Sequence, residues 1–180
     1  MRALFLDRDG VINIDYGYVG SRERFDFFPG IFELTRAAKA RGLAIFIVTN
    51  QAGIARGLFT EDDFACLMKW VLGEFAQAGT PITGCYHCPH HPDFGLDHLR
   101  IRCDCRKPQP GLLLRASREH DVDMAGSVMV GDKEGDMLAG HAAGVGTLIL
   151  LGGAQTDPRW KNAASLEEVA AMLGNLETGS

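Results

Sequence analysis

Four apolar runs, each followed directly by polar residues, restrict the fold of this chain more than any other feature. They cover residues 3–6, 43–48, 127–130 and 147–151. Apolar runs of this length, without polar residues at alternate positions, suit strands that are buried on both faces of a parallel sheet. We therefore expect these four segments to form the central strands of the molecule.

Helical patterns lie between and after these runs. Apolar residues recur every three or four positions behind N-cap residues at Thr60 and Ser165, and ahead of Gly42, which suits a helix C-terminus. The helices are expected at residues 31–38, 64–75, 134–143 and 166–173. Strands that alternate with helices predict an α/β fold, with a doubly wound parallel sheet of Rossmann type. The ligand site of such a sheet lies beyond the carboxyl ends of its strands.

The length of 180 residues fits one domain. We interpret residues 1–174 as that domain, residues 85–107 as a small loop insert within it, and residues 175–180 as a tail. Only residues 10–48 separate Asp9 from Thr49, and one helix and one strand use most of them. We therefore expect no cap domain between these two positions.

Charge and hydropathy exclude several classes of protein. The formal net charge is −5, without a block of like charges, so we expect no binding to nucleic acid or to an anionic membrane. The longest apolar run, residues 43–48, is far shorter than the ~20 residues that cross a bilayer. The charged residues at the start, Arg2 and Asp7 among them, do not fit a signal peptide. We expect a cytoplasmic protein, and a monomer.

Two carboxylates follow the first apolar run. Asp7 and Asp9 are two positions apart, so both side chains can face the same way at the end of a strand. Such a pair can hold a divalent cation, and one of the two can also act as a nucleophile. The alternative is a plain turn, because the pair Asp9-Gly10 is also typical of turns.

Further polar residues follow the second and third runs. Thr49, Asn50 and Gln51 can donate hydrogen bonds to phosphoryl oxygens, although such residues also cap helices. Asp132 can add a carboxylate to a metal site, with Asp136 one helical turn further on; the alternative is an acidic first turn of a helix. Lys107 can neutralise phosphoryl charge, whereas an isolated lysine is usually a solvated loop residue.

Taken together and in this order, these motifs resemble the four motifs of the haloacid dehalogenase superfamily, from Leu4 to Asp136. The resemblance implies a Rossmann-like core and phosphoryl transfer through an aspartyl-phosphate. It implies that Asp7 is the nucleophile and Asp9 the general acid and base. It also implies that Thr49 and Lys107 hold the transferred phosphoryl group, and that Mg²⁺ is bound by Asp7, the backbone carbonyl of Asp9 and Asp132.

The insert contains a second candidate metal site. Cys88 and His90 form one close pair, and Cys103 and Cys105 form another. Four such ligands in two pairs suit a tetrahedral structural Zn²⁺ site. The alternative is a loop of reduced cysteines.

Other residues near the insert leave its ligand set open. Cys85 stands at ligand spacing from Cys88, and His87 and His91 are further candidates. Cys66 lies in a helical pattern, and we interpret it as a small, buried or half-buried hydrophobe.

Longer segments narrow the resemblance. The segments at residues 6–10, 49–57, 88–92 and 103–108 resemble the D,D-heptose 1,7-bisphosphate phosphatases, which remove the 7-phosphate in heptose precursor synthesis for lipopolysaccharide or S-layer glycans. The segment 15–19 resembles their substrate loop. Ala52 stands where the common pattern has Ser, and Arg106 could grip a second anionic group. The substrate-binding set so implied is Asp15, Tyr16, Gly17, Tyr18, Thr49, Asn50, Gln51, Ala52, Arg106, Lys107 and Lys133.

Three alternatives stay open at this point. The first is a histidinol-phosphate phosphatase, which shares the nucleophile and zinc motifs but has a shorter zinc loop. A DNA 3′-phosphatase would need the basic face that the charge pattern does not indicate. A catalytically silent zinc-binding scaffold would not need both acids and Lys107. A comparison of turnover on heptose bisphosphate and on histidinol phosphate separates the two enzyme hypotheses.

Overall fold

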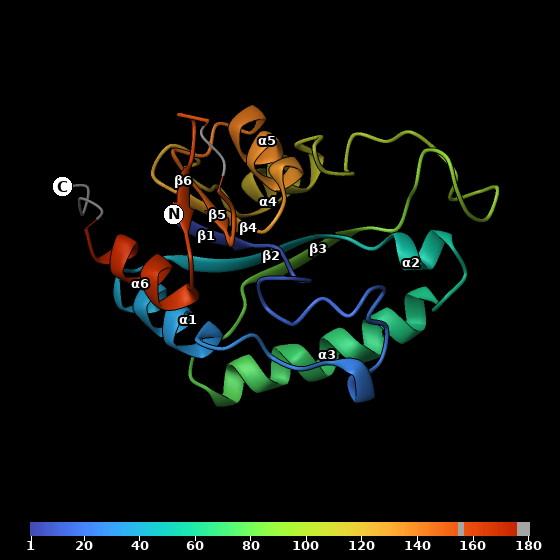
Figure 1. Cartoon of the computed structure of the whole chain (residues 1–180), viewed down its shortest axis with the longest axis horizontal. Helices are drawn as coiled ribbons and strands as arrows, with labels where there is room; N and C mark the ends of the chain where they lie inside the picture. The colour runs from blue at the N-terminus through green and yellow to red at the C-terminus, as the bar shows by residue number, and fades with distance from the viewer. Residues whose placement is uncertain (155–156, 176–180) are drawn as a thin grey trace.

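A computed structural model describes residues 1–154 and 157–175 of the chain (Figure 1). Its centre is a parallel sheet with the strand order β3-β2-β1-β4-β5-β6. The strands are β1 (Ala3–Leu6), β2 (Ala44–Asn50), β3 (Gly84–Cys88), β4 (Val128–Gly131), β5 (Thr147–Leu151) and β6 (Lys161–Ala163). The two central pairings join β1 to β2, with Leu6 opposite Ile47, and β1 to β4, with Leu6 opposite Val130.

Helices cover both faces of the sheet. Figure 1 shows α1, α3 and α6 on one face and α4 and α5 on the other. The helices are α1 (Ile31–Ala40), α2 (Ala52–Ala55), α3 (Glu61–Gln77), α4 (Gly111–His120), α5 (Glu134–Ala142) and α6 (Leu166–Gly174), with the 3-10 helix η1 (Arg22–Arg24). Two apolar clusters, one on each face, include the fully buried residues of β1. The doubly wound α/β fold expected from the sequence is therefore confirmed.

The local start and stop signals hold where the sequence predicted them. Thr60 caps α3: its hydroxyl accepts a hydrogen bond from the backbone of Asp63, whose carboxylate accepts one from the backbone of Thr60. Ser165 caps α6, because its hydroxyl accepts a hydrogen bond from the backbone N–H of Glu168. Gly42 has a φ of +70°, in the left-handed region that suits the residue after a helix. Cys66 is a correction, because it is exposed on α3.

Five elements were not expected from the sequence: β3, β6, α4 and the short helices η1 and α2. Strand β3 lies at the start of the expected loop insert, residues 85–107. Its sequence is rich in Cys and His and contains no apolar run, so the sequence does not predict a strand there. Strand β6 has three residues without an apolar run. Helix α4 follows Pro110 directly and buries Leu112, Leu113 and Ala116 on one face. The expected tail, residues 175–180, lies outside the described residues except for Asn175, the C-cap of α6.

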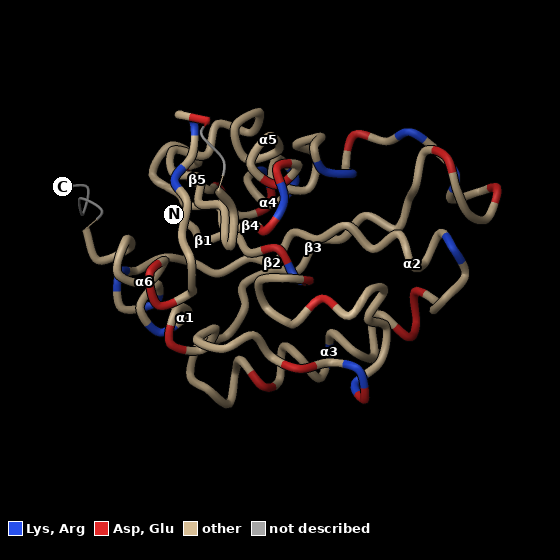
Figure 2. The backbone as a smooth tube through the Cα atoms, in the orientation of Figure 1, with Lys and Arg blue, Asp and Glu red and all other residues tan. Residues whose placement is uncertain are grey.

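Two connections surround the carboxyl ends of the strands. Residues 7–30 lead from β1 to α1 through η1, without a further domain among the described residues. Residues 89–110 lead from β3 to α4 and form a long loop, which extends away from the sheet in Figure 1. We refer to residues 89–106 as the metal loop. Basic and acidic residues are interspersed along the described chain (Figure 2). None of its described helices is long and apolar enough to span a membrane.

Candidate active site

A buried lysine joins two carboxylates at the carboxyl edge of the sheet. Lys107 Nζ lies 2.9 Å from Asp7 Oδ1 and 2.6 Å from Asp136 Oδ1, and it donates a hydrogen bond to the Val48 carbonyl at 2.7 Å. Asp7 directly follows β1, and Asp136 lies in the first turn of α5. The structure therefore brings Asp7, Lys107 and Asp136 together, and the solvated-loop alternative for Lys107 is wrong, because this side chain is buried.

The protonation of these groups follows from their burial. Burial and the charge of Asp136 raise the pKa of Asp7, although Lys107 acts in the opposite direction. Burial alone would lower the pKa of Lys107, but Asp136 and Asp7 raise it well above its usual range. The ammonium therefore stays charged at neutral pH and stabilises two carboxylates that would otherwise repel each other.

The carboxylate of Asp9 is held by three side chains. The guanidinium of the fully buried Arg8 donates from Nη2 to both oxygens, at 2.7 and 2.9 Å. Asn13 Nδ2 donates to Oδ1 at 3.0 Å, and Gln51 Nε2 donates to Oδ2 at 2.9 Å. Asp9 is thus oriented at the end of β1, two residues from Asp7.

The end of β2 supports this site from the side. Thr49 is fully buried, and its hydroxyl accepts a hydrogen bond from Gln51 at 2.9 Å. Asn50 pairs with the backbone of Lys107 twice: its carbonyl oxygen accepts from the N–H, and its amide donates to the carbonyl, each at 3.0 Å. Asn50 therefore fixes the position from which the lysine side chain enters the sheet.

Asp132, directly after β4, supplies a third carboxylate. Oxygen atoms of Asp7, Asp132 and Asp136 lie within 4.8 Å of one another. A Cβ on Gly10 would stand 2.3 Å from the Asp132 carboxylate, so only glycine permits this approach. Lys133 Nζ lies 3.7 Å from Asp132 and 3.3 Å from Asp15.

The donor set suits a magnesium ion. Asp132 Oδ1 is buried and has no hydrogen-bond partner among the described residues. Asp136 is less suited as a ligand, because one oxygen pairs with Lys107 and the other accepts from the Lys133 backbone. A divalent cation between Asp7 and Asp132 would occupy the free carboxylate oxygens and offset the repulsion between them.

A test of this site is the pH dependence of thermal stability. Burial, and then the charge of Asp7, raise the pKa of Asp132 to about 7 in the folded, metal-free chain. Its unfolded value is 3.8, so the folded state binds more protons between these values, and the stability contribution of Asp132 falls as the pH rises through this window. We expect the increase in melting temperature on adding Mg²⁺ to be larger at pH 8 than at pH 5.5. Equal increases at both pH values, measured by scanning fluorimetry, would contradict this. The control is Asp62→Asn, which removes a carboxylate at an exposed position outside the site.

A cavity of about 470 Å³ opens above the carboxylates. Most of the residues that the sequence predicted line it: Asp7, Asp9, Asp15, Gly17, Tyr18, Asn50, Gln51, Ala52, Arg106, Lys107 and Lys133. Tyr16 does not; its hydroxyl donates to Asp26 at 2.8 Å. Thr49 and Asp132 are not among the residues that line this cavity. Gly53, His91, Gly135 and Asp136 also line the cavity.

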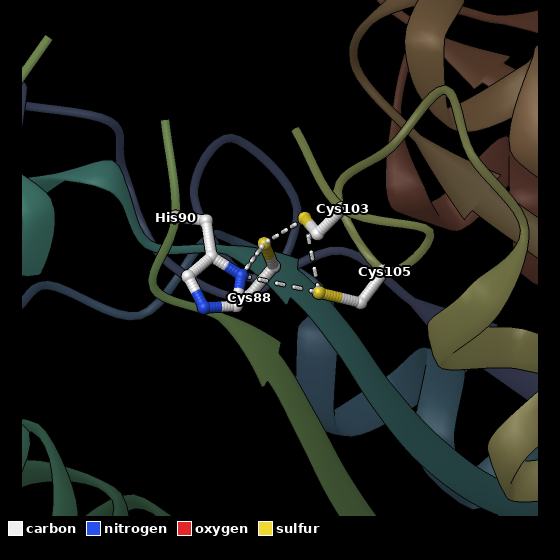
Figure 3. Close-up of side chains that lie close together, drawn as sticks. All are labelled: Cys88, His90, Cys103 and Cys105. Carbon is white, nitrogen blue, oxygen red and sulfur yellow. Dashed lines mark hydrogen bonds between the residues drawn. The ribbon is translucent and has the colours of Figure 1, made fainter. Parts of the chain in front are cut away.

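Four side chains of the metal loop and β3 converge on one point (Figure 3). Cys88 Sγ lies 3.5 Å from Cys103 Sγ and 3.7 Å from His90 Nδ1, and Cys105 Sγ lies 3.3 Å from Cys103 Sγ and 3.6 Å from His90 Nδ1. Ligands of a tetrahedral Zn²⁺ with ordinary bond lengths stand roughly 3.5–3.8 Å apart. The donor set and its spacing therefore suit a closed tetrahedral zinc site.

The other candidate ligands lie elsewhere. Cys85 packs against the core, with its backbone opposite Ile47. His87 Nε2 lies 2.7 Å from a Glu61 carboxylate oxygen. His91 Nδ1 accepts hydrogen bonds from two backbone N–H groups of its own loop. None of the three belongs to the cluster of four.

The fold and the site together define a class of hydrolases with a Rossmann-like core. Their shared features are an aspartate directly after β1, a second aspartate two residues later, a buried lysine and an aspartate after β4. A family model described as HAD-hydrolase-like matches residues 104–176. A D-glycero-alpha-D-manno-heptose-1,7-bisphosphate 7-phosphatase of Burkholderia mallei is 54% identical over 83% of this chain and 79% of that protein. A D-glycero-beta-D-manno-heptose-1,7-bisphosphate 7-phosphatase of Vibrio cholerae is 52% identical over 83% and 80%, respectively.

A solved structure leads to the same group. The D,D-heptose 1,7-bisphosphate phosphatase of B. bronchiseptica, complexed with magnesium and phosphate, superposes with a TM-score of 0.83 at 31% identity, over 96% of this chain and 98% of that one. The chain belongs to the family of D-glycero-D-manno-heptose-1,7-bisphosphate 7-phosphatases.

The sequence alone did not indicate the role of three residues that build the site, Arg8, Asn13 and His91. Arg8 lies between the two aspartates, and a charged residue next to buried strand residues is a signal for a buried ion pair. The sequence offers His91 as a candidate zinc ligand, whereas the structure places this residue in the lining of the cavity.

Proposed function

We propose that this chain is a magnesium-dependent phosphatase that removes the 7-phosphate of D-glycero-D-manno-heptose 1,7-bisphosphate through an aspartyl-phosphate on Asp7. The observation that carries the proposal is the buried Lys107 between Asp7 and Asp136 at the floor of a cavity large enough for a sugar phosphate. The names of relatives that share about half of their residues with this chain support the substrate.

In the first step, a carboxylate oxygen of Asp7 attacks phosphorus, and the bond from phosphorus to the sugar oxygen breaks. Asp9, as a carboxylic acid, gives its proton to that leaving oxygen. Lys107 and the hydroxyl of Thr49 hold the oxygens of the transferred group. Lys107 is already charged and fixed, so its ammonium needs no rearrangement to stabilise phosphoryl charge.

In the second step, Asp9, now a carboxylate, takes a proton from water. The water oxygen attacks phosphorus, the bond from phosphorus to Asp7 breaks, and inorganic phosphate leaves. Arg8, Asn13 and Gln51 orient the Asp9 carboxylate for this step through their hydrogen bonds.

Two metal ions complete the proposal. Mg²⁺, held by Asp7, the Asp9 carbonyl and Asp132, supplies positive charge that offsets repulsion between the nucleophile and an anionic ester. Zn²⁺, held by Cys88, His90, Cys103 and Cys105, supplies structural stability to a loop without a core of its own. Asp136 positions Lys107, and the metal loop takes the place of a cap domain above the cavity.

The remaining residues of the cavity would select the sugar bisphosphate. Asp15, Gly17, Tyr18, Gln51, Ala52, Arg106 and Lys133 line it. Arg106 is held by a hydrogen bond from Nη1 to the His90 carbonyl at 3.1 Å, which places a guanidinium at the edge of the metal loop. The relatives' names favour this substrate over histidinol phosphate. We further propose a cytoplasmic monomer with one domain over residues 1–174.

The substrate is tested through Arg106→Ala. A guanidinium that binds the sugar bisphosphate contributes a charge-assisted hydrogen bond of ~1.5–3 kcal/mol, so kcat/KM on heptose bisphosphate should fall about 10- to 100-fold. Hydrolysis of p-nitrophenyl phosphate should change little, because this ester offers Arg106 no second anionic group. Lys107→Ala is the matched control and should slow both substrates together. Equal losses on both substrates for Arg106→Ala would place Arg106 at the transferred phosphoryl group instead.

A further inference from the structure

The ring of His91 has a defined tautomer. His91 is half-buried in the metal loop, and its Nδ1 accepts hydrogen bonds from the backbone N–H groups of Asp93 and Phe94, each at 3.2 Å. Only an unprotonated nitrogen can accept them, so the proton of the neutral ring is on Nε2. Nε2 makes no hydrogen bond within the described residues, while the side chain lines the cavity.

Packing holds this ring in place. It packs at a tilt against Phe94, with 4.8 Å between the ring centres. The guanidinium of Arg56, at the end of α2, lies 4.6 Å from the centre of the Phe94 ring and 5.3 Å from that of Tyr18. The next residues of the loop dock on α2 as well, because the Leu96 N–H donates to the Ala55 carbonyl at 2.7 Å. Arg56 therefore connects the metal loop to the loop that carries Tyr18.

Acidic residues gather on the floor of the cavity, and cationic groups lie along the wall that the metal loop forms. Its floor contains Asp7, Asp9 and Asp136 with Lys107, where one phosphate would react. The wall made by the metal loop presents Arg106 and His91 and has Arg56 behind it. An N–H donor beside two guanidinium groups suits an anionic group. Such an anion would belong to the end of the substrate that is remote from Asp7.

We propose that His91 is a specificity-determining residue, whose Nε2–H donates a hydrogen bond to the phosphate that the substrate retains. This inference rests on the proposed function. In a sugar bisphosphate whose 7-phosphate lies at Asp7, the retained group is the 1-phosphate. The reaction product, a heptose 1-phosphate, keeps that contact until it leaves.

The experiment compares His91→Ala and His91→Gln on three substrates: heptose 1,7-bisphosphate, heptose 7-phosphate and p-nitrophenyl phosphate. His91→Ala should lower kcat/KM on the bisphosphate about tenfold, the usual effect of losing one hydrogen bond to a charged group. The two monophosphates should change less than about twofold. His91→Gln keeps an N–H donor near the position of Nε2, so it should restore most of the loss.

Product inhibition gives a second measurement of the same contact. The inhibition constant of heptose 1-phosphate against p-nitrophenyl phosphate hydrolysis should rise about tenfold in His91→Ala and little in His91→Gln. Zinc content and melting temperature should stay at wild-type values in both variants.

Several results would overturn the inference. They are a loss shared equally by all three substrates, unchanged product inhibition in His91→Ala, or release of zinc from both variants, which would mean that His91 acts through the metal site. Failure of the proposed function looks different. In that case wild-type enzyme would hydrolyse heptose bisphosphate no faster than p-nitrophenyl phosphate, before any variant is made.

Discussion

Asp7→Asn is expected to lower kcat by at least about 10³-fold, because an amide does not attack phosphorus and removing a covalent nucleophile usually has the largest effect of any single change. The fold should remain. Asp7 is buried and its pKa is raised by burial and by Asp136, so the neutral amide removes a repulsion, while Lys107 keeps its contact with Asp136. The measurements are single-turnover hydrolysis of p-nitrophenyl phosphate with Mg²⁺ and the melting temperature.

The control for this experiment is Asp62→Asn, since Asp62 is exposed at the start of α3 and does not line the cavity. It should keep wild-type activity. If Asp7→Asn kept a rate within tenfold of wild type, in protein of verified mass, Asp7 would not be the nucleophile. A variant that did not fold would instead contradict the electrostatic argument given for its stability.

The second large effect concerns the metal loop. Wild-type protein should contain about one zinc per chain by metal analysis, and Cys103→Ala should contain little. Structural zinc contributes folding free energy on the order of 10 kcal/mol in small zinc peptides. Losing even ~3 kcal/mol should lower the melting temperature of a chain of this size by about 6–12 °C. The sheet should stay folded, because its strands pair without the loop.

Cys85→Ala is the matched control, because Cys85 lies on β3 three residues before Cys88 and packs against the core instead of joining the cluster. It should keep its zinc. Mild treatment with a chelator, followed by Mg²⁺ alone, should restore full activity if zinc stays bound. Wild-type protein that is purified without zinc and is equally stable and active would refute the structural role.

The sequence was sufficient for the parts of the fold that repeat a simple physical pattern. Strands β1, β2, β4 and β5 are buried on both faces, so their interiors are apolar, and the polar residues at their carboxyl ends meet at one edge. The grouping of Asp7 and Asp132 follows from that edge. The place of Lys107 in the site followed only from the family resemblance, because Lys107 lies in the connection between β3 and α4. The spacing of the two ligand pairs was enough to predict that Cys88, His90, Cys103 and Cys105 form one cluster.

Other features depend on contacts between distant residues, which no local pattern records. Strand β3 contains Cys85 and His87, which the sequence left open as candidate metal ligands, because a strand at the edge of a sheet tolerates polar residues. The double hydrogen bond from Asn50 to Lys107 joins positions far apart in the chain. The orientation of His91 depends on a turn of its own loop.

The pairing of Asn50 with Lys107 has a consequence for how relatives of this chain could diverge. An amide side chain there imitates the edge of a neighbouring strand, and so fixes the backbone of the lysine directly to the sheet. The segment between β3 and Lys107 is therefore anchored at both ends, so a change in its length should not move the reacting groups at the floor of the cavity. A chimera that receives a shorter or longer segment from another phosphatase should inherit a new choice of substrate together with an unaltered reaction centre.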